Sequence, residues 1–252
     1  MAAFSSTLPR ALKHRWRMAA RHGRHRRKHG LIAVEGIKPI QEALRAGLTP
    51  TAVTAKDENT LHQLSFPETC PAYVSPQALS EVASTAGPLP AAALFDMPPT
   101  PPPPRHVRRA LILDHIQHPG NAGALVRTAL WFGVEHLIFY GGIDPWHPRL
   151  ISGSAGAIFH ISWQQATAPE PLTHFLQARR LPLFTAVMDG PPIDQIERPS
   201  AFALIVGNEG HGLSPHWNSE AARPVSIPAC QPFESLNVAV AAAVILYHWR
   251  PC

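Results

Sequence analysis

The chain has 252 residues, of which 45% are hydrophobic, so it is long enough for one large domain or two modest domains with their own cores. No apolar run reaches the ~18 residues of a membrane span, because the longest, from Val238 to Tyr247, is too short, and we expect a soluble protein. Cys70, Cys230 and Cys252 form no CxxC pair, which disfavours a zinc site or a disulfide framework and indicates a reducing compartment, the cytoplasm.

The formal net charge of +5 is unevenly distributed along the chain. Residues 1–30 contain no acid and nine basic residues: Arg10, Lys13, Arg15, Arg17, Arg21, Arg24, Arg26, Arg27 and Lys28. The other 13 of the 22 Lys and Arg residues stand against 17 acidic ones, a net of −4 for the remainder. Basic side chains that neutralise phosphates release condensed counterions, so nucleic acid is the simplest partner for this segment. A solvated tail and a cleaved transit peptide are the alternatives.

Residues 8–28 predict a basic helix, although Gly23 weakens it. His22, His25 and His29 recur there at helical spacing, and the arginines between them favour a phosphate-facing surface over a metal site. Hydrophobic periodicity then predicts a compact α/β unit over residues 30–96. We expect its strands at 30–36, 52–54, 72–74 and 91–95, and its helices at 37–44, 57–64 and 76–83.

Residues 97–106 hold six prolines and form the clearest boundary in the chain, a semi-rigid polyproline spacer. The predicted domains are therefore a basic segment at 1–29, the α/β unit at 30–96, the linker at 97–106 and a second domain at 107–252. In the second domain we expect strands at 110–114, 136–140, 183–187, 202–206 and 224–227, and helices at 121–132, 170–180 and after Val238. This alternation predicts an α/β fold with a mainly parallel sheet, with ligands at the loops that leave the carboxyl ends of the strands.

Three loops of the second domain, at residues 114–127, 206–213 and 227–238, combine glycines with polar side chains. In the first, we expect Asn121 to cap the following helix. Arg127 lies nearly two turns into that helix, either as a solvated residue or in a phosphate-binding cleft. The glycines of the second loop permit close approach to a ligand but fit neither GxGxxG nor a Walker motif, so an ordinary turn remains an alternative. The third loop delivers Ser235 and Asn237 to a helix rich in alanine, which permits close packing.

Taken together, the three segments resemble the SPOUT superfamily, specifically the SpoU/TrmH branch of RNA 2′-O-ribose methyltransferases. The matching stretches are His118-Pro-Gly-Asn-Ala-Gly-Ala-Leu-Val-Arg-Thr-Ala129, Gly207-Asn-Glu-Gly-His-Gly-Leu213 and Ile227-Pro-Ala-Cys-Gln-Pro-Phe-Glu-Ser-Leu-Asn-Val238. The resemblance covers about residues 110–250. Residues 30–44 also look like the L30e-like substrate-binding domain that is often fused to this branch.

The resemblance implies an S-adenosylmethionine (SAM) site without a metal, in a deep trefoil knot formed where the C-terminal segment threads through an earlier loop. It also implies a homodimer through the C-terminal domain. By motif, the cofactor would contact Gly207, Gly212, Ile227, Ala229 and Leu236. The catalytic residues around the acceptor ribose would be Asn121, Arg127, Glu209, Ser235 and Asn237.

The implied reaction is methyl transfer to a ribose 2′-hydroxyl of structured RNA, and ribosomal RNA is favoured over tRNA because the L30e-like domain accompanies that substrate class. In the family Arg127 is the usual candidate for activating the hydroxyl. Because a guanidinium is rarely deprotonated in proteins, orienting the adjacent phosphate is the alternative role.

Three residues depart from the family pattern: His118 replaces Asp or Asn, Ala229 replaces Met, and Gln231 replaces Gly. A residue other than glycine at 231 bears on the loop conformation and so on cofactor affinity more than on the fold. A non-catalytic RNA-binding or ribosome-assembly factor on the same fold is the competing hypothesis. A nucleotide-binding oxidoreductase is disfavoured because the dinucleotide fingerprint is missing.

Overall fold

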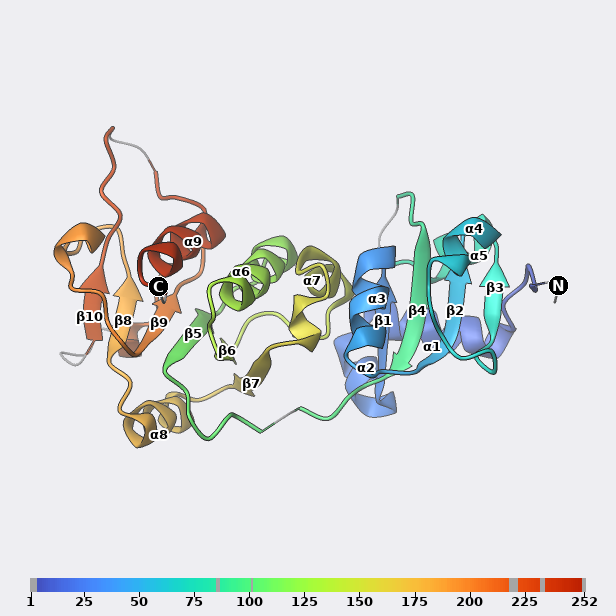
Figure 1. Cartoon of the computed structure of the whole chain (residues 1–252), viewed down its shortest axis with the longest axis horizontal. Helices are drawn as coiled ribbons and strands as arrows, with labels where there is room; N and C mark the ends of the chain where they lie inside the picture. The colour runs from blue at the N-terminus through green and yellow to red at the C-terminus, as the bar shows by residue number, and fades with distance from the viewer. Residues whose placement is uncertain (1–3, 85–86, 101, 218–221, 232–233, 251–252) are drawn as a thin grey trace. The chain divides into compact units, whose positions relative to one another are not determined.

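The computed structural model describes residues 4–84, 87–100, 102–217, 222–231 and 234–250 (Figure 1). The chain divides into two compact units: unit 1 is Met1–Pro99 with Asp144–His160, and unit 2 is Thr100–Ile143 with Ile161–Cys252. Each unit is an α/β structure with its own sheet. None of the described helices is long and apolar enough to cross a membrane.

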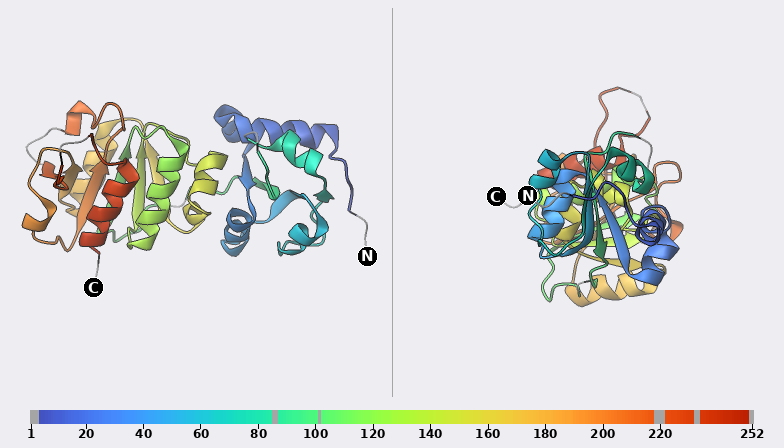
Figure 2. Two further views of the ribbon diagram at one scale, coloured as in Figure 1. Left: turned by 90° about the horizontal axis from the view of Figure 1, so that it is seen from above. Right: turned by 90° about the vertical axis from the view of Figure 1, so that its right-hand side faces the viewer.

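Unit 1 is built on a four-stranded sheet in the order β1-β4-β2-β3. Its strands are β1 (Leu31–Glu35), β2 (Pro50–Ala55), β3 (Ala72–Val74) and β4 (Ala91–Asp96), and β4 runs antiparallel to both neighbours. Its α-helices are α1 (Arg10–Arg21), α2 (Gly23–His29), α3 (Ile37–Arg45), α4 (Glu58–His62), α5 (Pro76–Val82) and α7 (Pro148–Gly153). Alternate strand residues such as Leu31 and Ala33 join a buried cluster with α1 and α5, so these two helices cover one face of the sheet (Figure 2).

The basic N-terminal segment is part of this packing, because Trp16, Ala19 and Ala20 of α1 are buried in the cluster. The reading as a solvated tail is therefore wrong for the described residues. The single helix predicted over 8–28 is also wrong, since His22 is extended with φ −129° and separates α1 from α2.

Arg26, one of the nine basic residues in the N-terminal segment, is buried inside unit 1. Its side chain is 2% exposed and donates to Asp144 through Nε at 3.0 Å and Nη2 at 2.8 Å, and to the carbonyl of Ala19 at 2.8 Å. A buried ion pair of this kind leaves Arg26 unavailable to phosphate.

Residues 144–160 pack in unit 1, although the domain limits predicted from the sequence placed them in the second domain. Ser152 donates to the backbone carbonyl of Glu35 at 2.8 Å, and His160 lies 2.9 Å from the carboxylate of Glu42. The helix α7 in this segment was not predicted, because its six residues are too few for a periodic pattern. A short 3₁₀ turn, η1 (Ala157–Phe159), follows it.

Unit 2 is a sheet of six strands in the order β10-β8-β9-β5-β6-β7, with parallel pairing throughout. The strands are β5 (Arg109–Asp114), β6 (His136–Tyr140), β7 (Ser162–Ala166), β8 (Leu183–Ala186), β9 (Phe202–Val206) and β10 (Ala222–Val225). The helices are α6 (Pro119–Trp131), α8 (Pro169–Arg179) and α9 (Val238–His248), with 3₁₀ turns η2 (Ile193–Gln195) and η3 (Pro215–Trp217). The mainly parallel α/β sheet predicted from the alternation of elements is confirmed.

Two layers of helix cover this sheet, with α8 on one side and α6 and α9 together on the other (Figure 1). Ala110 and Ile112 of β5 pack toward Phe175 of α8, while on the other side Trp249, just after α9, contacts Phe202 with ring centroids 5.2 Å apart. Strand β7 was not predicted, since its sequence Ser-Trp-Gln-Gln-Ala is that of a half-exposed edge strand. Strand β10 lies two residues earlier than expected.

Candidate functional site

The candidate site is assembled by loops that leave the same edge of the parallel sheet of unit 2. Strands β5, β8, β9 and β10 pair in parallel, so their carboxyl ends lie together. The loops after β5, β9 and β10 are the three that carry the predicted motifs. The sheet topology therefore brings three segments far apart in sequence to one place.

Side chains from all three loops meet in one hydrogen-bonded chain. Asn121 of α6 donates through Nδ2 to Glu209 Oε1 at 2.5 Å, and Asn237 donates through Nδ2 to Asn121 Oδ1 at 3.1 Å. Asn237 also caps α9, because its Oδ1 accepts from the backbone N–H of Ala239 at 2.9 Å. Three of the five predicted catalytic residues, Asn121, Glu209 and Asn237, are thus in contact.

The capping role predicted for Asn121 is wrong, because His118 occupies the N-cap of α6 and Pro119 begins the helix. The His118 Nδ1 accepts from the Asn121 backbone N–H at 3.4 Å, a long hydrogen bond. His118 therefore performs the capping that Asp or Asn would perform at this position. As a result, the side chain of Asn121 is free to join Glu209 and Asn237.

The loop after β9 is folded back on itself around Gly207. A Cβ on Gly207 would lie 2.5 Å from the backbone carbon of Gly212, a distance that real Cβ atoms do not reach. Gly212 has φ +68°, in the left-handed region that favours glycine. Asn208 Oδ1 accepts from the backbone N–H of Gly210 at 2.9 Å and closes the turn that presents Glu209.

A buried carboxylate joins the base of this loop to the first loop. Asp114 is 0% exposed and accepts from Ser214 twice, from the backbone N–H at 2.6 Å and from Oγ at 2.7 Å. His115 has φ 52°, and its Nδ1 lies 2.7 Å from Asp114 Oδ1. The amide of Asn208 donates to the His115 carbonyl at 2.9 Å, so the two loops are held together on both sides of the turn.

The third loop leaves its backbone open to solvent beside these groups. Ala229 and Gln231 are exposed, Ile227 is half-buried, and Leu236 is 51% exposed. The backbone groups of residues 227, 229–231, 235 and 236 make no hydrogen bond with any other described residue. Pro232 and Phe233 of this motif lie outside the described residues.

Arg127 and Ser235 do not join the hydrogen-bonded chain of Asn121, Glu209 and Asn237. Both are exposed, and neither makes a hydrogen bond or ion pair with the described part of the chain. Arg127 is six positions beyond Asn121, so at 3.6 residues per turn the two point about 120° apart around α6.

A fourth loop at this edge was missed by the sequence analysis. The segment after β8 is tied to the end of β10, because Ser226 donates through Oγ to the Gly190 carbonyl at 2.7 Å and the Ile193 backbone N–H donates to the Ser226 carbonyl at 2.9 Å. It carries Met188, which is 64% exposed. Its position after a strand was the sequence indication, since the segment carries none of the three motifs.

An apolar groove of about 550 Å³ runs between α6 and α9. Ala124, Phe132 and Val244 line it, and Asn121 and Asn237 are among its polar residues. Nearby, Trp131 is 82% exposed and Tyr247 is 55% exposed. Both aromatic side chains are therefore open to solvent.

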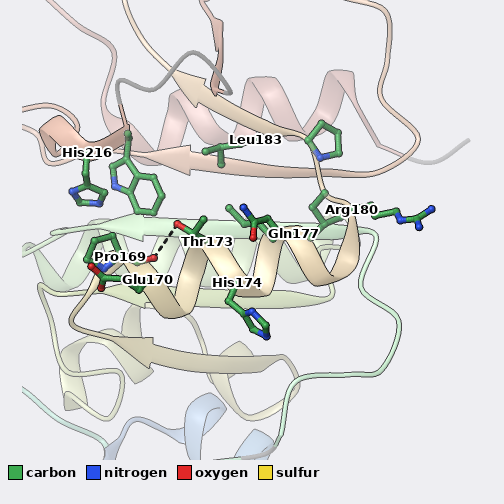
Figure 3. Close-up of a pocket in the computed structure, with 12 residues that line it drawn as sticks. Pro169, Glu170, Thr173, His174, Gln177, Arg180, Leu183 and His216 are labelled. Atoms are coloured by element: carbon green, nitrogen blue, oxygen red, sulfur yellow. Dashed lines mark hydrogen bonds between the residues drawn. The ribbon is translucent and has the colours of Figure 1, made fainter.

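A larger hollow, of about 630 Å³, lies elsewhere in unit 2 between α8 and the start of β8 (Figure 3). Leu183, His216 and residues of α8 line it, and none of the ten predicted site residues does. This hollow is therefore separate from the loops at the carboxyl edge, where polar groups from three segments converge.

The chain matches a known family over most of unit 2. The sequence profile of the SpoU rRNA methylase family matches residues 108–247. The 23S rRNA (guanosine(2553)-2′-O)-methyltransferase RlmP of Bacillus subtilis is 31% identical over 230 residues, which cover 90% of this chain and 91% of that protein. A 23S rRNA (uridine(2479)-2′-O)-methyltransferase from Streptomyces viridochromogenes is 30% identical over 54% of this chain and 50% of its own length.

Solved structures of other proteins resemble this structure over nearly the whole chain. A TrmH-family protein from Porphyromonas gingivalis has a TM-score of 0.83 at 27% identity and covers 97% of this chain and 99% of its own. The SpoU methyltransferase AviRb from S. viridochromogenes, solved with AdoMet, has a TM-score of 0.82 at 24% identity over 95% of this chain and 97% of its own, and supports the fold. The chain belongs to the SpoU rRNA methylase family.

Proposed function

We propose that this protein transfers a methyl group from SAM to a ribose 2′-hydroxyl of ribosomal RNA. The observation that carries the proposal is the hydrogen-bonded chain Glu209–Asn121–Asn237, in which each residue comes from a different motif of the family. The B. subtilis relative, similar over 90% of this chain, is named for 2′-O-methylation of 23S rRNA, which favours ribosomal RNA over tRNA.

The residues at the carboxyl edge fit SAM in their chemistry. The cofactor has an apolar, flat adenine and several polar edges, so it needs apolar contacts together with free backbone donors and acceptors. Leu236 and Met188 provide exposed apolar side chains, and the third loop provides the unused backbone groups. We assign cofactor contacts to Gly207, Gly212, Ile227, Ala229 and Leu236. Gln231, the residue that departs from the family's glycine, is exposed.

When bound, SAM supplies a methyl group already activated by its sulfonium, so the protein needs only to align the acceptor and help remove one proton. Asn121 is held by Glu209 and Asn237 and orients the ribose. Ser235 and Arg127 have no competing partner among the described residues and remain available to RNA. The guanidinium of Arg127 binds the phosphate beside the target ribose and stabilises the developing alkoxide, since its planar fork suits a phosphate.

The same proposal includes the finer architecture of the family. The crossover from β9 to β10 passes over β8, and we propose that the C-terminal segment there forms the trefoil knot. Residues 30–96 form the L30e-like domain. The exposed apolar residues of α6 and α9 support a homodimer interface through unit 2. The relatives that act on 23S rRNA are bacterial, which supports a cytoplasmic location.

Two measurements on purified protein test the proposal. Calorimetry with SAM should show binding, and labelled methyl groups should then enter ribosomal RNA prepared from cells that lack the gene. Arg127→Lys should bind SAM as the wild type does but lower single-turnover methyl transfer on the order of 10²-fold, because lysine lacks the bidentate fork. RNA binding without methyl incorporation by the wild type would instead indicate a non-catalytic RNA-binding factor.

A further inference from the structure

Helix α1 carries a row of basic side chains along one side. Arg10, His14, Arg17 and Arg21 follow one another at intervals of three or four residues, so they lie within about 60° of each other around the helix. All four are exposed. At a rise of 1.5 Å per residue, the row extends over about 16 Å. We call these four residues the α1 row.

The row is fixed in place by the opposite side of the helix. Trp16 is 0% exposed, and Ala19 and Ala20 are buried with it against the sheet of unit 1. Figure 2 shows α1 lying along the outside of that unit. An ordered helix presents its cations without the entropy loss of a disordered tail, which strengthens electrostatic binding.

The acids near α1 and α2 already have partners. Glu81 of α5 pairs with Lys13 at 3.1 Å, and Asp144 is bound by Arg26 at 2.8 Å. Arg10 and Arg17 make no ion pair or hydrogen bond with any described residue, while Arg21 donates to the Ala83 carbonyl at 3.2 Å and keeps its charge. Neither of these two carboxylates is therefore paired with a residue of the α1 row.

We propose that the α1 row binds the phosphate backbone of the RNA substrate. A straight row of three arginines and one histidine, with no apolar or aromatic side chain between them, matches a polyanion, and it provides phosphate contacts that carry no sequence information. The row thus supplies affinity and register, while the target nucleotide is recognised in unit 2. The inference rests on the proposed function, because it takes RNA to be the substrate.

The test compares substitutions on two sides of the same helix. The double variant Arg10→Gln/Arg17→Gln removes two charges from the row. Arg15→Gln is the single-charge control, because Arg15 is also exposed but lies about 100° or more around α1 from every residue of the row. Binding of in vitro transcribed ribosomal RNA is measured against salt concentration, together with the KM for RNA, kcat and the affinity for SAM.

The double variant should bind RNA at least about tenfold more weakly at low salt, and the slope of log affinity against log salt should become shallower by about 1.5. Its KM for RNA should rise while kcat and SAM affinity stay unchanged. Arg15→Gln should shift these values far less, and Arg10→Lys/Arg17→Lys should restore most of the binding because it keeps the charges.

The proposal is overturned if the double variant binds RNA like the wild type, if Arg15→Gln weakens binding as much, or if the lysine variant fails to restore it. In each of these cases methylation by the wild type would still support the proposed function. A wild-type protein that neither binds nor methylates RNA would overturn both.

Discussion

Asn121 is the residue on which the candidate site depends most. It donates to Glu209 and accepts from Asn237, so it fixes the relative positions of three loops with a single amide. An amide can do this because it has both donor and acceptor atoms, whereas a carboxylate only accepts when ionised. The role follows from His118 having taken over the helix cap.

Replacing the Asn121 amide with a carboxylate should make the rate of methyl transfer depend on pH. In Asn121→Asp, two carboxylates would lie within hydrogen-bond distance of each other, and their repulsion is relieved only when one of them is protonated. We expect methyl transfer by Asn121→Asp to be lost on the order of 10²-fold at pH 8 and to recover in part as the pH falls toward 5.5.

Asn121→Ala is the control, since it removes the amide without adding charge. It should lower methyl transfer without this recovery at lower pH. Parallel pH profiles for the two variants would contradict the contact between Asn121 and Glu209.

In the loop after β9, the close approach of two backbone segments determines the shape of the loop. Gly207 lies against Gly212, whose carbonyl accepts from the Asn208 backbone N–H at 2.9 Å. Gly207→Ala places a methyl group 2.5 Å from backbone, which the loop can relieve only by opening. We expect SAM affinity to fall at least about tenfold.

The same loop offers a matched control. A Cβ at Gly210 would meet Asn208 Oδ1 at 3.6 Å, an ordinary contact, so Gly210→Ala should bind SAM nearly as the wild type does. Calorimetry with SAM on the two variants measures both affinities. Equal affinities for SAM would show that the tight turn at Gly207 does not shape the cofactor site.

The sequence predicted elements well where hydrophobic periodicity was strong. Strands 72–74, 136–140 and 202–206 were placed at their observed limits, because each is a short apolar run bounded by turn residues. Strand β7 and helix α7 were missed, since a polar edge strand and a helix of six residues give too weak a pattern. The grouping of residues 144–160 with unit 1 depends on tertiary contacts such as Arg26 with Asp144, which no local pattern contains.

For the candidate site, the sequence predicted which loops carry the polar residues but not all of the contacts between them. The motifs named the three loops, and the parallel sheet brings their side chains together at one edge. The sequence did not show that His118 caps α6, because a histidine is a less usual cap than the asparagine three residues later. The loop of Met188 was missed because its proximity to the site arises from pairing between β8 and β10.

At the scale of the whole molecule, one buried histidine makes stability depend on pH. His136, at the start of β6, is 0% exposed and has its Nδ1 3.0 Å from Ser162 Oγ, while its Nε2 has no partner in the described chain. Burial lowers the pKa of His136 from 6.5 to about 4. The folded state therefore resists protonation that the unfolded state accepts.

The sign of the effect follows from proton binding. Between pH 6.5 and about 4 the unfolded chain binds more protons at this position, so stability falls as the pH is lowered through this window. The loss from His136 approaches about 3 kcal/mol below pH 4. Thermal unfolding of His136→Phe should show a shallower decline over this range than the wild type, whereas substitution of the exposed His174 should leave the decline unchanged. An equally steep decline in His136→Phe would contradict this role.

The central claim is that this protein methylates a ribose 2′-hydroxyl of ribosomal RNA. Mapping 2′-O-methylation across all cellular RNA, with and without the gene, tests it most directly. We predict that one site in ribosomal RNA is lost without the gene, and that the wild-type gene but not Arg127→Lys restores it. Loss of no site, or loss of a site in tRNA alone, would contradict the claim.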